Sequence, residues 1–301
     1  MTVGTSVEYA LEVLGNGGLV AIPTETVYGL AADAANEAAV RRIFAAKGRP
    51  ADHPLIVHVA AAEHLAAWAT DVPASAELLA ATCWPGPLTL LVPKAAHVLS
   101  AVTGGRGSVG IRVPANALTT ELLTRWGGGV AAPSANLFGR VSPTTAAHVQ
   151  ADLGGLVDYV LDGGPCPVGV ESTIVDCTVD PPQILRPGAI TRAEIGALLG
   201  GDVAEASGPS RAAGMLAAHY SPAATVLLVD SAADAAFAAR GRPHSWILDR
   251  SGDLAAYARF LYADLRDADA RGMQFIIAIM PPPIGLGHAI RDRLTKAATS
   301  A

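Results

Sequence analysis

Residues 47–58 read KGRPADHPLIVH, and they join an apparent helix to an apparent strand. The stretch places Lys47, Arg49, His53 and His58 close to that junction, among one glycine and two prolines. Only three lysines occur in the 301 residues. A lysine and an arginine two residues apart, held by glycine and proline, suit the binding of a polyphosphate. The alternative is a solvated helix C-terminus, where the helix dipole favours basic residues.

The composition predicts a globular chain with a packed core. Hydrophobic residues make up 51% of the 301 positions and charged residues 16%, and this length allows one large or two ordinary domains. Up to Glu205 there are 11 basic against 19 acidic residues, a charge of −8, and from Ala206 onward 10 against 8, a charge of +2. A general nucleic-acid binder usually presents a basic face, so the balance disfavours that class, DNA included. A local basic pocket for one small anion remains open.

The cysteines and the hydrophobic runs predict an intracellular chain without a membrane segment. Cys83, Cys166 and Cys177 are odd in number and lack CxxC spacing, so we expect reduced thiols and no zinc site. The N-terminus has no basic region followed by an apolar one, and the apolar run 275–280 is stopped by three prolines. No signal peptide or membrane span is therefore expected, and the expected location is the cytoplasm.

Hydrophobic periodicity predicts a mixed α/β fold in the first part of the chain. Residues 7–14 follow helical spacing, and Asn36 is placed to cap a second helix that ends near Lys47. Short apolar runs predict strands at 19–22, 55–59, 88–92, 109–113, 129–132, 158–161, 173–176 and 183–185. Further helices are predicted at 61–69, 117–126, 144–153 and 191–199. The strands are too numerous and too irregularly spaced for a plain βαβ repeat.

The last third of the chain predicts a second domain. Residues 202–224 contain Ser-Gly-Pro-Ser and Ser-Pro with little periodicity, so a linker is placed at 206–224, between domains 1–205 and 225–301. Strands are predicted at 225–229, 245–248 and 274–279, with helices between them, one of them from Asp253, and a last helix near 290–298. This alternation predicts a small, mostly parallel α/β domain.

Two polar motifs in the first sixty residues lie at strand ends. Residues 23–30, PTETVYGL, follow the first predicted strand, where hydroxyls and a carboxylate commonly form a ligand site. A turn stabilised by its own Thr and Glu side chains explains the same residues. In the second motif, residues 47–58, His58 lies inside an apolar strand, where a hydrogen-bonded core histidine is the favoured interpretation.

Two further motifs follow later strands. Residues 108–114, SVGIRVP, place Arg112 in an apolar strand, and an inward guanidinium must be paired there, ideally with a carboxylate or phosphate. The alternative is an arginine on the solvent face of an edge strand. Residues 132–136, APSAN, and 142–145, SPTT, offer small polar groups to a nucleotide. Helix N-capping by Ser142 or Thr144 is the alternative there.

Six motifs taken in chain order resemble those of YrdC-like threonylcarbamoyl-AMP synthases. PTETVYGL, KGRP with PLIVH, GIRVP and PSAN are followed by ESTIVD at 171–176 and LRPG at 185–188. HYSP at 219–222 and the extra C-terminal α/β domain resemble the longer, two-domain members, so the resemblance covers nearly the whole chain. It implies a twisted, mixed α/β sheet curled around a basic cavity, plus a smaller Rossmann-like domain that does not carry the chemistry.

The resemblance also implies a reaction. Such enzymes use L-threonine, bicarbonate or CO2, and ATP with Mg2+ to make threonylcarbamoyl-AMP and pyrophosphate. The product feeds the formation of threonylcarbamoyladenosine in tRNA, through possible contact with the tRNA-modifying transferase machinery. No covalent enzyme nucleophile is needed, so catalysis should consist mainly of positioning and charge neutralisation.

Site roles are carried over by motif match. Lys47 and Arg49 are expected to hold the triphosphate and to act in catalysis. The residues expected to bind L-threonine are Thr26, His58, Arg112, Ala132 and Ser172, with Arg112 on the carboxylate. The residues expected to bind ATP are Arg49, His53, Ser108, Ser134, Asn136, Ser142, Arg186 and Tyr220, with Tyr220 in a linker lid that excludes water. No protein metal site is expected, since Mg2+ would arrive with ATP.

The chain departs from the family pattern in three places. His53 stands where the family usually has Asn, although both can donate a hydrogen bond. The family linker usually reads Gly-Met-Lys-x-Arg-His-Tyr, whereas Leu216, Ala217 and Ala218 follow Gly-Met in this chain. The Lys and Arg of the family linker are therefore both absent from this chain, which predicts that the lid binds phosphate more weakly. The C-terminal domain is also short for the family.

Two rival functions are weaker. A module that binds RNA or tRNA without ATP turnover conflicts with the −8 charge of residues 1–205. A carbamoyl-transfer relative in hydrogenase maturation normally carries zinc-finger modules, and the chain has no CxxC pairs.

Overall fold

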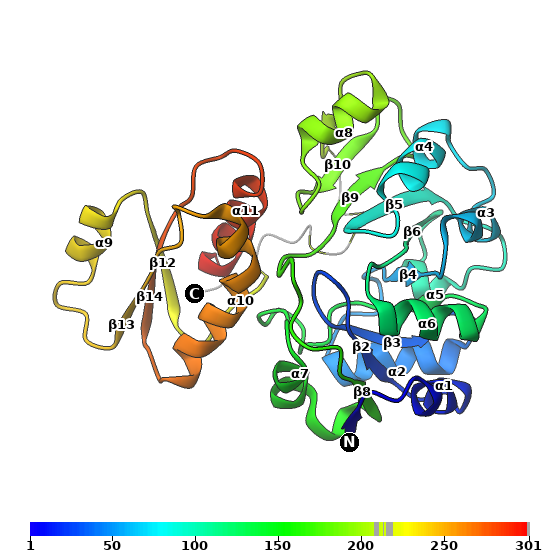
Figure 1. Cartoon of the computed structure of the whole chain (residues 1–301), viewed down its shortest axis with the longest axis horizontal. Coiled ribbons are helices and arrows are strands. Elements are labelled where there is room, and N and C mark those ends of the chain that lie inside the picture. The colour runs from blue at the N-terminus through cyan, green and yellow to red at the C-terminus, as the bar shows by residue number, and fades with distance from the viewer. Residues whose placement is uncertain (208–210, 213, 215–218, 300–301) are drawn as a thin grey trace.

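The structure is a computed structural model of the chain, and it describes residues 1–207, 211–212, 214 and 219–299. Figure 1 shows two α/β lobes of unequal size, the larger formed by the N-terminal part of the chain and the smaller by the C-terminal part. None of the helices in the described residues has the length and apolar character that crossing a bilayer requires.

In the described part of the chain, the larger lobe is built on one mixed sheet of eleven strands, ordered β1-β8-β2-β3-β7-β4-β6-β5-β9-β10-β11. Within it, β4 pairs in parallel with β6, whereas β5 pairs antiparallel with β6. The predicted mixed sheet is therefore confirmed. Its strands are β1 (Thr2–Gly4), β2 (Val20–Ile22), β3 (Gly29–Asp33), β4 (Ile56–His58), β5 (Leu88–Pro93), β6 (Ser108–Arg112), β7 (Val130–Ala131), β8 (Tyr159–Leu161), β9 (Thr173–Asp176), β10 (Gln183–Arg186) and β11 (Ala204–Glu205).

Helices surround this sheet (Figure 1). Two short 3-10 helices are η1 (Ala62–His64) and η2 (Gly154–Leu156). The α-helices are α1 (Val7–Gly15), α2 (Glu37–Lys47), α3 (Leu65–Trp68), α4 (Ala74–Cys83), α5 (Ser100–Thr103), α6 (Ala117–Trp126), α7 (Ala146–Leu153) and α8 (Arg192–Leu199).

The helix that leads to the KGRP motif forms as its sequence predicts. The Asn36 side chain accepts a hydrogen bond from the Ala39 N–H at 3.1 Å and so caps α2. Val40 and Ile43 are fully buried against the sheet, one turn apart on one face. The helix ends with Lys47 in its last turn, which fixes where the motif leaves the helix.

Six elements were not predicted from the sequence: β1, β3, β11, α4, α5 and η2. The strand β3 reads GLAAD, and Gly and Ala are poor strand formers, but pairing with β2 and β7 on its two sides holds it extended. In α4 the apolar side chains lie around the whole helix, so no amphipathic stripe marks it. The helix predicted at 144–153 begins at Ala146, because Thr145 is its N-cap, and the helix predicted at 61–69 is divided into η1 and α3.

The smaller lobe is a three-stranded parallel sheet in the order β12-β14-β13, which confirms the predicted parallel α/β architecture. Alternate residues of β14 face opposite sides: Ile276 packs toward α10 and α11, whereas Ile277 packs toward α9. The elements are β12 (Thr225–Val229), α9 (Ala232–Ala238), β13 (Ser245–Leu248), α10 (Leu254–Ala270), β14 (Phe275–Ile279) and α11 (Gly287–Ala298).

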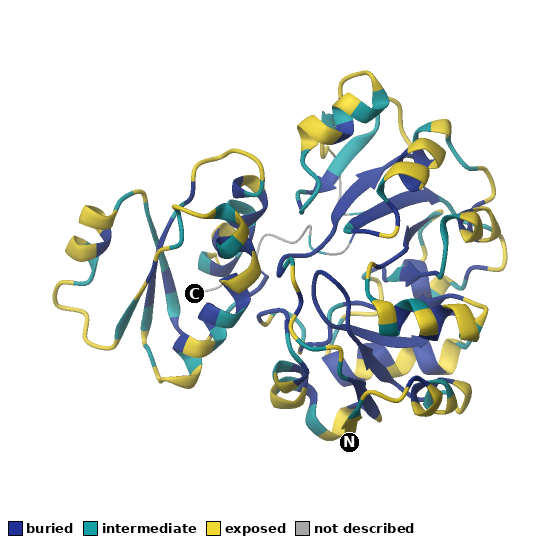
Figure 2. Cartoon of the chain, viewed as in Figure 1, coloured by how far each residue is buried: buried dark blue, intermediate teal, exposed yellow. Residues whose placement is uncertain are grey.

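The two lobes share a hydrophobic cluster. Val27, Val141 and Val170 of the larger lobe pack in the same cluster as Leu261 and Tyr262 of α10. Figure 2 shows buried residues in both sheets and on the helix faces turned toward them, with exposed residues on the outer helices. The smaller lobe is thus packed against the larger one and not merely tethered to it.

Candidate active site

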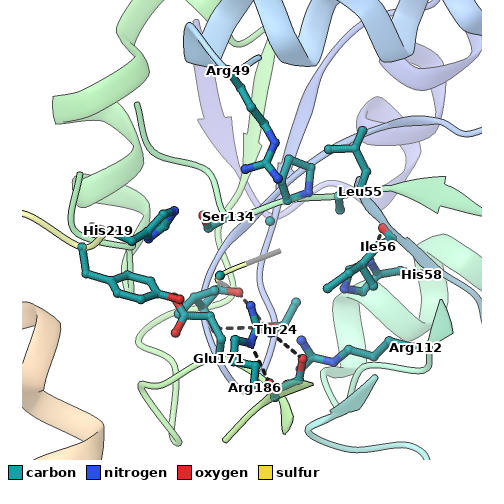
Figure 3. Close-up of a pocket in the computed structure, with 17 residues that line it drawn as sticks. Thr24, Arg49, Leu55, Ile56, His58, Arg112, Ser134, Glu171, Arg186 and His219 are labelled. Atoms are coloured by element: carbon teal, nitrogen blue, oxygen red, sulfur yellow. Dashed lines mark hydrogen bonds between the residues drawn. The ribbon is translucent and has the colours of Figure 1, made fainter. Parts of the chain in front are cut away.

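One cavity lies among the strand ends and loops of the larger lobe, where the linker meets them. Figure 3 shows Arg49 reaching into it from one side and Arg112 and Arg186 from the other. Three guanidinium groups around one space make it suited to anions. Its lining residues are Thr24, Val27, Gly29, Arg49, Leu55, Ile56, His58, Arg112, Ala132, Pro133, Ser134, Glu171, Ser172, Arg186, Gly214, His219 and Tyr220.

Arg49 reaches the cavity because α2 ends in a glycine turn. Gly48 adopts a φ of 62°, which side-chain-bearing residues rarely take, and the Arg49 N–H donates back to the Phe44 carbonyl at 3.0 Å. The guanidinium donates to the Pro54 carbonyl at 3.1 Å and lies 5.7 Å from the centroid of the Phe138 ring. Burial lowers the pKa of Arg49 to about 10, so the group is still cationic at neutral pH.

Lys47 is not among the lining residues of the cavity, but it contacts the lining residue Ser134. Its ammonium group donates to the carbonyls of Ser134 and Asn136, both at 2.5 Å, and the residue is 2% exposed. Burial, and after it the charge of Arg49, hold the pKa of Lys47 well below its usual value. The solvated-helix interpretation is therefore wrong for Lys47, which acts as a buried clamp on the loop that carries Ser134.

The PTETVYGL loop is a self-stabilised turn that also lines the cavity. The Thr24 hydroxyl donates to the Val27 carbonyl at 2.6 Å and accepts from the Thr26 N–H at 3.1 Å. The loop in turn holds Arg112, whose Nη2 lies 2.8 Å from Glu25 Oε1 and donates to Thr26 Oγ1 at 2.9 Å. Arg112 is buried on β6, a strand between β4 and β5, so the edge-strand alternative is wrong.

His58 is both a core residue and a lining residue. Its Nδ1 lies 3.3 Å from the Ile56 carbonyl, and the side chain is buried. Burial and the neighbouring Arg112 charge lower the pKa of His58 to about 3. The imidazole is therefore neutral at physiological pH and can exchange hydrogen bonds with a ligand without adding charge.

Arg186 fixes Ser172 at the floor of the cavity. The Arg186 Nε donates to the Ser172 carbonyl and Nη2 to the Ser172 hydroxyl, both at 3.0 Å. The LRPG motif can approach this closely because Gly188 lacks a side chain: a Cβ there would lie 2.2 Å from the Thr173 nitrogen. Burial lowers the pKa of Arg186 from its usual value.

Glu171 has no role predicted from the sequence, yet it is the acidic residue of the lining. Its Oε1 accepts from the Ser142 hydroxyl at 2.6 Å, and its Oε2 accepts from the Tyr262 hydroxyl at 2.7 Å and from Arg293 Nε at 2.9 Å. Burial raises the pKa of Glu171, but Arg293, Arg186 and these hydrogen bonds outweigh it and bring the pKa to about 2. Ser142 is thus bonded to Glu171, and the cap of α7 is Thr145, so N-capping by Ser142 or Thr144 is wrong.

Phe138 is a second residue that no motif signalled. Its ring centroid lies 5.3 Å from that of His53 and 6.2 Å from that of His219, in addition to its contact with Arg49. The His219 ring lies 4.1 Å from the Tyr220 ring. Burial lowers the pKa of His219 to about 3, so this aromatic group adds no charge beyond that of Arg49 at neutral pH.

Tyr220 is a buried linker residue that lines the cavity. It is 1% exposed, adopts a φ of 64°, and stacks on Tyr262 with the ring centroids 5.6 Å apart. The Arg293 guanidinium carbon lies 5.3 Å from the Tyr220 ring centroid. Positions 215–218, where the family's basic residues are replaced, lie outside the described residues, so the predicted weaker grip on phosphate stays a prediction.

The predicted site residues fall into three groups. The cavity lining contains Arg49, His58, Arg112, Ala132, Ser134, Ser172, Arg186 and Tyr220. Directly bonded to lining residues are Lys47, Thr26 and Ser142, and the carbonyl of Asn136 shares Lys47 with that of Ser134. Outside the lining are His53, next to Phe138, and Ser108, at the opposite end of β6 from Arg112.

Glu171 is the acidic side chain among the described residues that line the cavity. Among the described residues, no group of three or more His, Cys, Asp or Glu side chains is arranged to hold a metal ion. The Glu171 oxygens already accept hydrogen bonds from Ser142, Tyr262 and Arg293. Such a site fits Mg2+ bound mainly by phosphate oxygens and water, which is its usual state with nucleotides.

Comparisons with known proteins point to one family. The family model described as "Telomere recombination", for Sua5, YciO and YrdC proteins, matches residues 12–188, and that for the threonylcarbamoyl-AMP synthase C-terminal domain matches residues 190–299. The chain is 40% identical to the threonylcarbamoyl-AMP synthase of Pyrococcus abyssi, over 97% of this chain and 93% of that protein. It is 38% identical to that of Bacillus subtilis, over 96% and 92%. The crystal structure of P. abyssi Sua5 complexed with L-threonine matches with a TM-score of 0.91 and 38% identity, over 98% of this chain and 94% of that one.

The twisted mixed sheet, the arginine-lined cavity and the docked C-terminal domain define a two-domain enzyme of the YrdC-like class. The chain belongs to the threonylcarbamoyl-AMP synthase family. The predicted family, fold class and enzymatic function are confirmed, and the chain is a nucleotidyltransferase of tRNA processing. The RNA-binding and carbamoyl-transfer alternatives are not supported.

Proposed function

We propose that this cavity binds L-threonine and ATP side by side and joins them through a one-carbon unit taken from bicarbonate. The observation that carries the proposal is the convergence of Arg49, Arg112 and Arg186 on one buried space from three separate segments (Figure 3). Both ends of the reaction need cations, because threonine brings a carboxylate and ATP a triphosphate. The P. abyssi relative in complex with L-threonine supports threonine as one of the substrates.

The chemistry balances without a covalent enzyme intermediate. The threonine amine attacks CO2, derived from bicarbonate, and loses a proton to give a carbamate. A carbamate oxygen then attacks the α-phosphorus of ATP, and the bond to the pyrophosphate oxygen breaks. The residues therefore need to align the reactants and to neutralise the charge on the departing pyrophosphate.

The threonine end of the cavity is proposed at the β4–β6 side. Arg112 would hold the carboxylate, since Glu25 and Thr26 fix its guanidinium in place. Neutral His58 and the hydroxyl of Ser172 would accept or donate hydrogen bonds to the rest of threonine, and Ala132 would contact it through its backbone. A fixed, desolvated guanidinium binds a carboxylate more selectively than a mobile one.

The nucleotide end is proposed on the opposite side, around Arg49. Arg49 would contact the triphosphate directly, whereas Lys47 would act through the Ser134 loop that it clamps. The amide nitrogen of Asn136 already donates to the Leu137 and Arg140 carbonyls. Its buried Oδ1 has no hydrogen-bond partner among the described residues, so it suits a donor such as the carbamate N–H better than a phosphate. The other proposed nucleotide contacts are those of His53, Ser108, Ser134, Ser142, Arg186 and Tyr220.

Mg2+ is proposed to enter with ATP, where it would offset phosphate charge, because Mg2+ in nucleotide sites is held mainly by phosphate oxygens and water. The product is proposed to pass to the transferase machinery that modifies tRNA. The proposed compartment is the cytoplasm, where ATP and tRNA are both available.

The direct test of this function is threonine-dependent pyrophosphate release. Purified protein is incubated with ATP, Mg2+ and bicarbonate, with L-threonine, with L-serine, or with neither. The proposal expects strong release with threonine and only background release otherwise. Equal release in all three mixtures, or none with folded protein that binds ATP, would contradict it.

Replacement of Arg112 by lysine should raise the KM for threonine about 10- to 100-fold and change the KM for ATP little, since lysine keeps the charge but loses the two-pronged contact with a carboxylate. Lysine is preferred to alanine because an alanine would leave Glu25 buried without its ion pair. Steady-state kinetics with each substrate varied in turn checks the result. A threonine KM that stays at the wild-type value would remove Arg112 from the carboxylate site.

Replacement of Tyr220 by alanine should increase hydrolysis of the product on the enzyme. Tyr220 is a buried wall of the cavity, and its removal opens a path for water between the linker and α10. The ratio of AMP to threonylcarbamoyl-AMP, measured by chromatography, should rise several-fold. An unchanged ratio in a folded variant would refute the role of Tyr220 in excluding water.

A further inference from the structure

The carboxylate in the cavity obtains its counter-charge from the other lobe. Glu171 lies in the loop before β9 and is 5% exposed, while Arg293 lies on α11 and is fully buried. The Arg293 Nε donates to Glu171 Oε2 at 2.9 Å, and the Tyr262 hydroxyl of α10 donates to the same oxygen at 2.7 Å. A buried ion pair between the two lobes therefore ends at a residue that lines the active site.

Arg293 also holds other parts of the cavity wall. Its Nη1 donates to the Pro187 carbonyl at 2.9 Å, which lies next to Arg186 in the LRPG motif. Its guanidinium carbon lies 5.3 Å from the ring centroid of Tyr220 in the linker. One side chain of the C-terminal lobe thus contacts a lining carboxylate, the neighbour of a lining arginine and a buried linker tyrosine.

The charge of Glu171 matters because of what the cavity has to bind. A buried carboxylate that loses its ion pair repels a polyphosphate strongly, since little water is present to screen it. It would also compete with ATP for the positive charge of Arg186, which already influences Glu171. When Arg293 neutralises Glu171, the positive charges of Arg49 and Arg186 remain available to bind the polyphosphate.

We propose that Arg293 is a positioning residue that neutralises Glu171, so that the C-terminal lobe sets the affinity of the active site for ATP. This inference rests on the proposed function, because it takes ATP as the polyphosphate. It gives the C-terminal domain a specific electrostatic task in the reaction. It also explains why a fully buried arginine is placed where the two lobes meet.

A second ion pair between the lobes supplies a matched control. Arg266 of α10 contacts Asp152 of α7, with Nη1 donating to Asp152 Oδ1 at 2.9 Å and Nη2 to Oδ2 at 2.7 Å. Asp152 is not a lining residue of the cavity. Asp152 and Glu171 each accept hydrogen bonds from an arginine of the other lobe. Asp152→Asn and Glu171→Gln therefore make the same carboxylate-to-amide change, the first outside the cavity and the second inside it.

The experiment measures ATP dissociation constants by calorimetry, and KM values for ATP and threonine, on the full-length chain. The variants are Arg293→Met, Glu171→Gln, their double variant, and Asp152→Asn. Arg293→Met should weaken ATP binding about tenfold or more and change the threonine KM little, because a buried carboxylate is left unpaired. The double variant should recover most of that loss, since it removes the carboxylate as well. Asp152→Asn should bind ATP as the wild type does.

The rescue separates charge compensation from a purely structural role. If Arg293→Met binds ATP normally, or if the double variant binds as weakly as Arg293→Met, the inference is overturned. Equal weakening by Asp152→Asn would also overturn it, because docking in general would then be the cause. Should Arg293→Met fail to fold, Glu171→Gln alone decides: retained ATP affinity supports the inference, and a tenfold loss overturns it. Wild-type protein that binds no ATP overturns both this inference and the proposed function, whereas failed rescue overturns only the inference.

Discussion

Replacement of Arg49 by alanine is expected to reduce threonine-dependent pyrophosphate release by about 100- to 1,000-fold, the usual cost of removing one preorganised charged donor from an active site. The Arg49 side chain contributes little to the fold, since among the described residues it donates one hydrogen bond, to the Pro54 carbonyl, and packs beside Phe138. Its buried Nε has no hydrogen-bond partner among the described residues, which leaves that donor for a ligand. The free energy of unfolding should therefore change by about 1 kcal/mol or less.

The measurement is the rate of pyrophosphate release together with a urea unfolding curve. Arg41→Ala is the matched control, because Arg41 lies on α2, the helix that leads to Arg49, but is exposed and forms an ion pair with Glu37 on the same helix. That control should turn over as the wild type does. Wild-type turnover in Arg49→Ala would refute the phosphate contact, and loss of stability in parallel with activity would show that Arg49 is structural instead.

Replacement of Lys47 by methionine is expected to cost both activity and stability. Methionine fills the same buried volume but leaves the carbonyls of Ser134 and Asn136 without their donor. Each buried acceptor left unpaired costs about 1–3 kcal/mol, so with two such carbonyls the free energy of unfolding should fall by about 2–6 kcal/mol. Turnover should fall as well, because the Ser134 loop lines the cavity.

Chemical denaturation and pyrophosphate release on the same preparation distinguish two roles for Lys47. A variant of wild-type stability with no activity would restore the direct phosphate contact that the KGRP motif suggests. A variant that is both stable and active would refute the clamp. The contrast with Arg49→Ala is the informative one, because the two cations are only two residues apart.

Much of the fold could be predicted because its elements carry local signals. Asn36 caps α2 and Gly48 ends it, and both act within one helical turn. The short apolar strands of the smaller lobe were placed within a residue of their bounds for the same reason. The strand β3 was missed because its Gly-Leu-Ala-Ala-Asp sequence has no intrinsic strand preference. It is held extended by β2 on one side and by β7, which is distant in sequence, on the other.

The candidate site could be predicted as a set of motifs but not as a geometry. Periodicity could place Lys47 at a helix end, but not show that its ammonium turns toward two carbonyls instead of the cavity. Glu171 lay inside a motif, but its partners Tyr262 and Arg293 are 91 and 122 residues away in the chain. Contacts at such separations follow from how two domains dock, and no local pattern encodes that.

The most direct test of the proposed reaction follows the bicarbonate carbon into the nucleotide product. The protein is incubated with ATP, Mg2+, L-threonine and 13C-labelled bicarbonate, and the nucleotide products are analysed by mass spectrometry. We expect a threonylcarbamoyl-AMP species that carries the 13C label, formed in step with pyrophosphate. Pyrophosphate release without a labelled adduct, or an adduct between threonine and AMP that lacks the labelled carbon, would contradict the proposed reaction.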